Sequence, residues 1–146
     1  RGPAAPAGRP WPWADMHPIA RLVIAGSATP LYVLENLSGQ SLAFGPAHDA
    51  ASVAPGERGN SIIAAHRDTH FAVLRGIAVG ADIQVQTAHA ERHFRVSSVR
   101  VVDSRQARIA LDAPVPRLTL ITCYPFDALR PGGPLRLVVE AEALGI

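Results

Sequence analysis

The chain has 146 residues, which is enough for one domain with a single hydrophobic core. Hydrophobic residues make up 48% of it, a share that excludes a disordered protein. The net charge is +2, and all fourteen basic residues are arginines scattered along the sequence. With few aromatic residues to stack on bases, this pattern does not indicate a nucleic-acid partner. The one cysteine excludes an internal disulfide, and no apolar run approaches the roughly 20 residues that span a membrane.

Residues 1–15 are rich in proline, alanine and glycine and lack the apolar centre of a signal peptide. We expect them to form a flexible lead-in, the truncated end of a tether. Trp11 and Trp13 within it are expected to pack against the folded body. Residues 16–146 are then expected to form the one folded domain.

After the lead-in, apolar segments of strand length alternate with glycine- and proline-rich breaks. The segments are residues 20–25, 30–35, 61–65, 82–87, 93–103, 117–123 and 135–142. Short strands at this spacing predict an all-β fold, a closed or nearly closed barrel. One short helix is expected to start at Asp68 or Thr69 and run to Ile77, and another is expected around residues 104–109.

The cysteine lies at the end of a predicted strand, residues 117–123, directly before a tyrosine and a proline that stop the strand. Alternation places Ile121 and Cys123 on one face of the strand and Thr122 on the other. A thiol at a strand end beside a loop can reach a bound peptide. The alternative is that Cys123 is a small buried hydrophobic residue.

Arg136 is near the start of the next predicted strand, after a loop over residues 124–134. If the two strands pair antiparallel, Cys123 and Arg136 become neighbours. A guanidinium there favours the thiolate and can donate to the oxyanion of an acyl transfer. The loop also carries Tyr124, a side chain less polar than a plain turn needs. The alternative role for Arg136 is an exposed strand arginine paired with a glutamate, either Glu140 or Glu142.

His66 follows a predicted strand that ends in small residues. Alternation puts Ala64 and His66 on one face, which leaves room for a substrate beside the imidazole. Histidine gives and takes protons near neutral pH, although a histidine at a strand end is often structural. His66 and His70 have a metal-like spacing, but the segment lacks the glutamate of H-E-x-x-H sites and a third ligand. We therefore expect no metal and no other cofactor.

Three motifs together resemble the sortase family of cysteine transpeptidases. Residues 119–123, TLITC, resemble its TLxTC motif, residues 65–69, AHRDT, resemble its GHRDT segment, and Arg136 follows at the expected distance. The chain departs from the family pattern at Ala65, where the family usually has glycine. This extra methyl group is expected either to be tolerated or to narrow the substrate groove and shift His66.

Shorter stretches suggest a subtype. Residues 44–48 and 59–60 are similar to class D-like sortases, and residues 124–126 and 131–134 look like the sortases of Gram-negative, often marine, bacteria. The resemblance implies a closed eight-stranded β-barrel with one or two short helices. It also implies an extracytoplasmic enzyme that is tethered to the inner membrane. An N-terminal anchor would be the part of the protein that contacts the membrane.

The resemblance further implies an activity. Family members cleave an LPxTG-like sorting signal of a surface or secreted protein, form a thioester on the cysteine, and pass the acyl group to an amine acceptor. Here Cys123 would be the nucleophile, His66 the acid–base group and Arg136 the oxyanion donor. The residues that would line the substrate groove by position are Ala47, Ala64, Ile121, Thr122 and Tyr124.

Two further expectations concern the loop before the histidine strand. His48 either faces the groove or caps this loop. Asp49 and Glu57 are too few oxygen ligands for a calcium site, so we expect calcium independence. Two alternatives to a transpeptidase stay open: a cysteine endopeptidase that releases its acyl group to water, and a non-catalytic β-barrel interaction module.

Overall fold

The fold is known from a computed structural model, which describes residues 18–36, 46–65, 70–124 and 133–145. The lead-in, residues 1–15, and His66 lie outside the described residues. The elements in this part of the chain are β1 (Ala20–Ile24), β2 (Leu31–Asn36), β3 (Ala47–Asp49), β4 (Gly59–Ala64), η3 (His70–Leu74), β5 (Asp82–Gln86), β6 (Glu91–Asp103), β7 (Pro116–Cys123) and β8 (Leu135–Ala143). None of the described helices is long and apolar enough to cross a bilayer.

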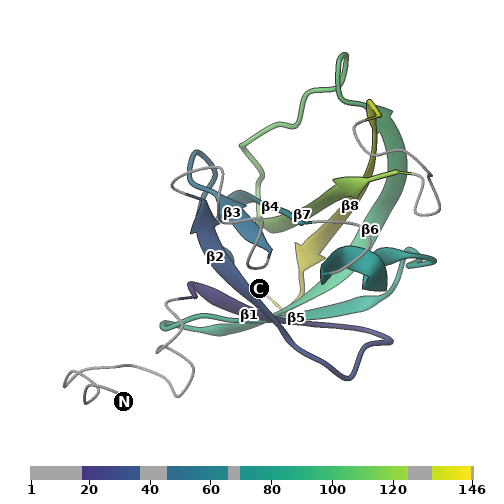
Figure 1. The fold of residues 1–146 in the computed structure, drawn as a ribbon. Coiled ribbons are helices and arrows are strands. Elements are labelled where there is room, and N and C mark those ends of the chain that lie inside the picture. The colour runs from purple at the N-terminus through teal and green to yellow at the C-terminus, as the bar shows by residue number, and fades with distance from the viewer. Residues whose placement is uncertain (1–17, 37–45, 66–69, 125–132, 146) are drawn as a thin grey trace, which may run out of the picture.

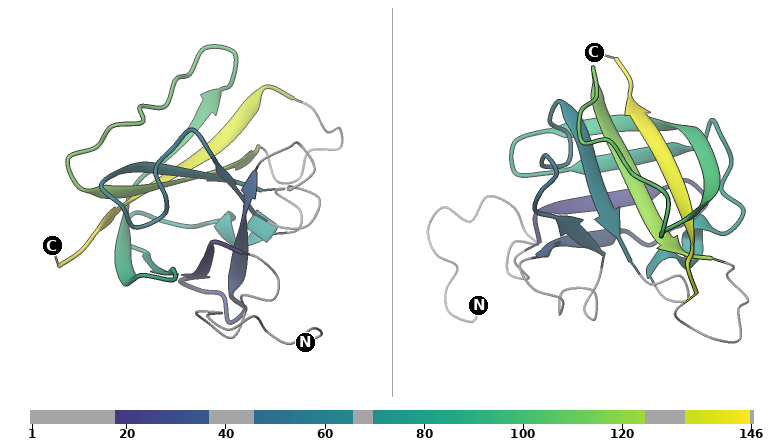
Figure 2. Two further views of the ribbon diagram at one scale, coloured as in Figure 1. Left: turned by 90° about the vertical axis from the view of Figure 1, so that its left-hand side faces the viewer. Right: turned by 90° about the horizontal axis from the view of Figure 1, so that it is seen from above.

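The strands close into one barrel in the order β1-β2-β3-β4-β7-β8-β6-β5 (Figures 1 and 2). Neighbouring strands run antiparallel except in two pairs, β2 with β3 and β4 with β7. The predicted all-β, eight-stranded barrel is therefore confirmed. In the parallel pair β4–β7, both strands end at the same edge of the sheet, which brings distant parts of the sequence together.

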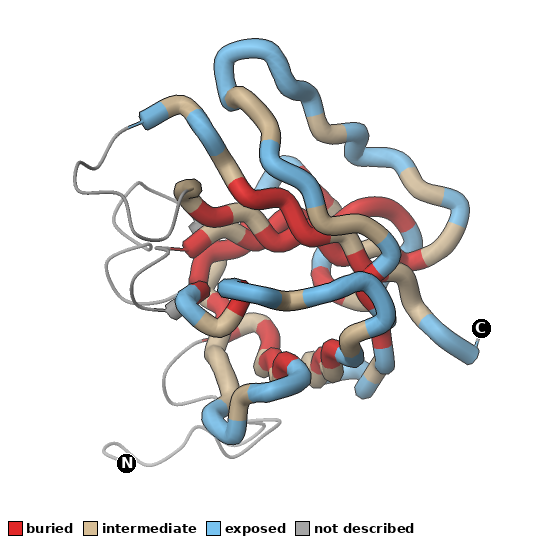
Figure 3. Tube along the Cα trace, turned by 90° about the vertical axis from the view of Figure 1, so that its right-hand side faces the viewer, coloured by how far each residue is buried: buried red, intermediate tan, exposed pale blue. Residues whose placement is uncertain are grey.

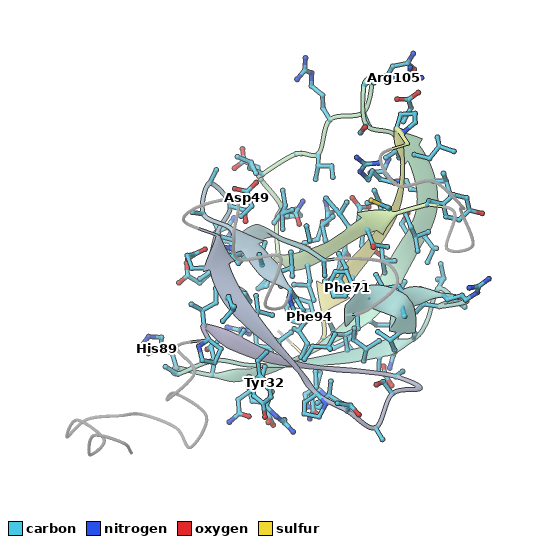
Figure 4. All side chains as sticks on the ribbon, viewed as in Figure 1. Tyr32, Asp49, Phe71, His89, Phe94 and Arg105 are labelled. Atoms are coloured by element: carbon cyan, nitrogen blue, oxygen red, sulfur yellow. The ribbon has the colours of Figure 1, made fainter. Side chains whose placement is uncertain are left out.

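Alternating apolar side chains produce these strands, because every second residue faces the barrel interior. In β1, for example, Ala20, Leu22 and Ile24 are buried and the residues between them are partly exposed. Figure 3 shows buried positions gathered along the strands and exposed ones along the connections. Phe94 from β6 and Phe71 from η3 are fully buried and lie near the middle of the molecule (Figure 4).

Two local predictions differ from the structure. Residues 104–109 do not form a helix: the backbone makes one turn, with the amides of Gln106 and Ala107 both donating to the Asp103 carbonyl, and then extends. The predicted helix up to Ile77 is a short 3₁₀ helix, η3, within the described part of that segment. Strand β3 was not predicted, because it has only three residues and two of them are polar.

The long connection between β6 and β7, residues 104–115, arches over the outside of the barrel (Figure 1). Asn60 of β4 fixes it: the Asn60 side chain donates to the Ala110 carbonyl at 2.7 Å, and its backbone amide donates to the Leu111 carbonyl at 2.9 Å. The Asn60 side-chain oxygen accepts from the Thr119 hydroxyl at 2.7 Å. One buried amide group therefore joins β4, β7 and the connection.

Candidate active site

Cys123 and Arg136 are directly opposite each other in the antiparallel pair of β7 and β8. Cys123 ends its strand and is partly exposed, so the thiol is accessible from the strand end. The expected neighbourhood of thiol and guanidinium is therefore present. It arises because β7 and β8 are joined by a loop and pair so that the end of one meets the start of the other.

The Arg136 guanidinium is held against the main chain beside the thiol. Its Nη1 donates to the carbonyls of Gly133, at 2.6 Å, and Leu135, at 2.8 Å. Within the described residues both bonds use Nη1, so the other guanidinium donors make no bond there. A donor that is positioned but uncommitted is what an oxyanion requires.

The two glutamates that could have paired with Arg136 have other partners. Glu140 accepts from Arg100 at 3.3 Å and Glu142 accepts from Arg117 at 2.9 Å. The alternative in which Arg136 serves as a simple cross-strand ion pair with Glu140 or Glu142 is therefore not what the structure contains.

The parallel pair β4–β7 brings the residue before His66 next to the residue before Cys123. The Ala65 amide donates to the Ile121 carbonyl at 3.2 Å, and the Thr122 hydroxyl donates to the Ala65 carbonyl at 2.8 Å. His66 itself lies outside the described residues, so its side chain is not located. The backbone that leads into His66 is nevertheless fixed at the end of β7.

Three of the predicted substrate-lining residues lie in one row across the sheet. Ala47 of β3 pairs with Ala64 of β4, and Ala64 pairs with Ile121 of β7. The row continues to Val138 of β8, which is fully buried. Directly opposite residues share a face, so this row lies on the same outer face as Cys123, two residues beyond Ile121. Ala64 and Ile121 are partly exposed there.

The other two predicted substrate-lining residues have different surroundings. Thr122 is 2% exposed and faces the barrel interior, with its hydroxyl bonded to Ala65. Tyr124 is partly buried, packs against the hydrophobic core, and its amide donates to the Leu135 carbonyl at 3.1 Å. The methyl group of Ala65 also belongs to the core, so it does not narrow the outer-face row.

His48 is a structural residue of β3. It is 2% exposed, with Nδ1 2.5 Å from a Glu35 carboxylate oxygen and Nε2 2.7 Å from the Val53 carbonyl. Its Nε2 is also 3.1 Å from the Ser52 hydroxyl. Both ring nitrogens are therefore engaged in holding β2 and the β3–β4 connection, which supports the loop-capping role.

Sequence reasoning missed the part that Asn60 plays beside this site. Residues 59–60 were noted only for their similarity to class D-like sortases, and the sequence predicted no role for the Asn60 side chain. Asn60 is 1% exposed and its partners Thr119 and Ala110 are 59 and 50 residues away in the sequence. Only one signal was available, two polar residues, Asn60 and Ser61, at the start of a strand that continues with apolar ones.

Comparison with known proteins gives consistent matches. The family model of the sortase domain matches residues 22–144. Sortase D of Bacillus subtilis (strain 168) is 28% identical over 98 residues, which are 66% of this chain and 50% of that protein. The chain therefore spans about half the length of this curated relative.

Solved structures with the same fold include sortase A from Corynebacterium diphtheriae, with a TM-score of 0.77 and 23% identity over 88% of this chain and 61% of that one. A Clostridium perfringens sortase D5 transpeptidase matches with a TM-score of 0.75 and 22% identity, over 88% and 79% of the two chains. These structural matches show the fold, and the family model spans most of the sequence. The chain belongs to the sortase family.

Proposed function

We propose that the chain is the catalytic domain of a cysteine transpeptidase, which cleaves an LPxTG-like sorting signal and transfers the acyl group to an amine. The observation that carries the proposal is the pairing of Cys123 with Arg136 at one end of the barrel. Acyl transfer needs a nucleophile and a nearby donor for the developing negative charge. Among the described residues, Arg136 has no carboxylate partner, and a non-catalytic barrel has no need for such an arginine beside its thiol.

In the proposed first step, the Cys123 thiolate attacks the scissile carbonyl carbon. The carbonyl oxygen becomes an oxyanion that accepts hydrogen bonds from Arg136. The carbon–nitrogen bond then breaks as His66, in its imidazolium form, gives a proton to the leaving amine. The products are a thioester on Cys123 and the released C-terminal peptide.

In the proposed second step, an acceptor amine attacks the thioester carbonyl carbon. Neutral His66 takes a proton from that amine, and Arg136 again donates to the oxyanion. The carbon–sulfur bond breaks, the Cys123 thiolate leaves, and a new amide bond joins acyl group and acceptor. If water attacks in place of the amine, the same groups yield a free acid and the enzyme acts as a hydrolase.

The row of Ala47, Ala64 and Ile121 supports a binding role on the same face as the thiol. The small side chain of Ala64 leaves space for a bound extended peptide, and Ile121 offers it an apolar contact, whereas Ala47 is only 3% exposed and would support the row from beneath. For Tyr124, which packs against the core and not along this row, we propose a contact with the substrate at the end of β7. For Thr122 we propose an indirect part, in which its hydroxyl positions the main chain that leads into His66.

The proposed setting follows the family. The domain would work outside the cytoplasm, tethered to the inner membrane by a segment beyond the described residues. Its partners would be the sorting-signal peptide of a surface or secreted protein and an amine acceptor. The match to sortase D is compatible with a class D-like subtype, and a Gram-negative origin stays a prediction.

The proposal is tested by incubating the protein with a library of LPxTG-like peptides and weighing the intact protein by mass spectrometry. We expect a thioester adduct on Cys123 and, with an added amine, a ligated product. Cys123→Ala should abolish the adduct, and Arg136→Gln should slow its formation about 100- to 1,000-fold because an oxyanion donor is lost.

Arg100→Gln is the matched control, because Arg100 is an arginine of the neighbouring strand that pairs with Glu140. It should leave the rate nearly unchanged. If the acyl product is a free acid even when amine is abundant, the protein is a hydrolase. A folded protein whose thiol reacts with small alkylating agents but with none of the peptides would refute catalysis and leave an interaction module.

A further inference from the structure

A second site lies at the end of the barrel away from Cys123. A cavity of about 820 Å³ opens there, lined by Val85 of β5, Val115 and Pro116 among others. Pro116 starts β7 and Cys123 ends it, so seven steps of roughly 3.3 Å place the two ends about 23 Å apart. The turn at His89, which also lines the cavity, is labelled in Figure 4 at the edge of the molecule.

The cavity lining is mainly apolar and includes three charged residues. Its size falls within the range of about 300–1,000 Å³ that is usual for sites of small ligands. Arg58, Glu57 and Arg92 supply two positive charges and one negative charge. The lining thus combines apolar side chains with a surplus of positive charge.

Arg92 is the residue that most needs a partner. It is opposite Val85, a core residue, so its side chain starts out on the interior face of the barrel. Its stem passes so close to Gly56 that a Cβ there would lie 3.6 Å from Arg92 Cδ. Among the described residues, Arg92 Nε is buried without a hydrogen-bond acceptor. Such a buried donor is costly, which indicates that an acceptor belongs in the cavity.

The chain enters the described fold at the rim of this cavity, since Pro18 and Ile19 line it. The residues just before them include both tryptophans of the protein, Trp11 and Trp13, and the one acidic residue of the lead-in, Asp15. Pro18 is five positions after Trp13, which allows a reach of at most about 18 Å. The segment is therefore long enough for a tryptophan ring and the Asp15 carboxylate to reach the cavity of the same molecule.

We propose that residues 11–15 dock in this cavity, with a tryptophan ring filling its apolar interior and the Asp15 carboxylate accepting a hydrogen bond from Arg92. An aromatic side chain suits an apolar pocket of this size, and a carboxylate matches the surplus of positive charge in its lining. Covalent linkage at Pro18 gives this segment a high effective concentration that a free ligand lacks. The docked segment would lead away from the barrel at the end opposite the thiol.

The test uses intrinsic fluorescence of the full chain, because Trp11 and Trp13 are its only tryptophans. We expect blue-shifted emission and acrylamide quenching several-fold weaker than for a free peptide of residues 9–17. Val115→Arg, which places a bulky cation in the cavity wall, should raise quenching to the peptide value. Trp11→Phe and Trp13→Phe should show which ring is buried, and Asp15→Asn should weaken the protection.

Val79→Arg is the matched control, because Val79 is 64% exposed and is not among the cavity-lining residues. It should leave the emission unchanged. Ala88→Arg, on an exposed turn of the rim, serves as a second blocking variant if Val115→Arg does not fold, as judged by circular dichroism. Peptide-like emission of the unaltered chain, or no response to both blocking variants, would overturn the proposal. If the unaltered chain shows peptide-like emission and also binds a fluorescent fatty acid, the proposal is overturned and the ligand of the cavity is an external apolar anion.

Discussion

The Thr122 hydroxyl joins two strands at the end of the barrel where Cys123 lies. Strand alternation correctly puts Thr122 on the interior face, opposite to Ile121 and Cys123. Its assignment to the substrate groove came from the motif and not from this alternation. The structure gives the side chain a nearby task, since it donates to the carbonyl that precedes His66.

Thr122→Val should therefore lower the free energy of unfolding by about 1–3 kcal/mol, because the Ala65 carbonyl loses a buried donor. Thr122→Ser keeps the hydroxyl and should lose only about 1 kcal/mol, the contribution of a buried methyl group. Urea unfolding with unchanged slope measures both variants. Equal stability of the valine and serine variants would contradict this role.

A second residue-level prediction concerns Asp103, whose pKa is lowered from 3.8 to about 2. Side-chain hydrogen bonds from Arg105 are the largest cause, at 3.0 Å from Nε and 2.7 Å from Nη2, followed by a backbone hydrogen bond from the same residue. The folded pKa is below the unfolded one, so the pair stabilises the fold above pH 3.8 and loses that effect as the pH falls toward 2.

An NMR titration of the Asp103 carboxyl group should give a pKa of about 2 in the native protein. In Arg105→Gln the pKa should rise toward 3.8, because the bidentate partner is gone. An unchanged value in the variant would show that another group holds the carboxylate.

Among the elements, the β6–β7 connection is held in place by a buried side chain of another strand, Asn60 of β4. It has little regular structure, yet Asn60 holds its middle through the carbonyls of Ala110 and Leu111. The same amide accepts from Thr119, so β4, β7 and the connection share one buried polar group. This explains how an extended segment stays in place over the outer face of the barrel.

Asn60→Ala should free the connection, because its side-chain bond to Ala110 disappears and the Thr119 hydroxyl loses its acceptor. We expect faster trypsin cleavage after Arg105 and Arg108 and a loss of about 1–3 kcal/mol in unfolding free energy. Thr119→Val is the matched control, since it removes one bond of the cluster but keeps the bond to Ala110. Equal cleavage rates in both variants would show that Asn60 does not restrain the connection.

The elements that sequence could predict are those with clear alternation. Segments 82–87 and 117–123 agree with β5 and β7 within a residue or so, because their apolar residues recur at every second position. Strand β3 was missed because its position depends on pairing with β2 and β4 and not on its own composition. The helix expected over residues 104–109 failed because tertiary contacts of Asn60 extend the chain beyond its first turn.

For the whole molecule, sequence could predict the meeting of Cys123 with Arg136, because one loop joins two strands that pair antiparallel. It could not predict the parallel pairing of β4 with β7, since strands so far apart in the sequence leave no local sign of their order. The cavity at the opposite end was also out of reach. Its walls come from four separate parts of the chain and meet only when the barrel closes.

The parallel pairing of β4 with β7 determines when, during folding, the proposed active site can form. Thr122 and the Ala65 carbonyl that it holds are 57 residues apart, so this contact forms only after β4 and β7 have paired. During synthesis or refolding, a polypeptide can carry Cys123 before β4 and β7 have paired. The residues that lead into His66 are then not held beside the end of β7. The proposed peptide cleavage would therefore require this pairing, and molecules that have not yet formed it would leave nearby peptides intact.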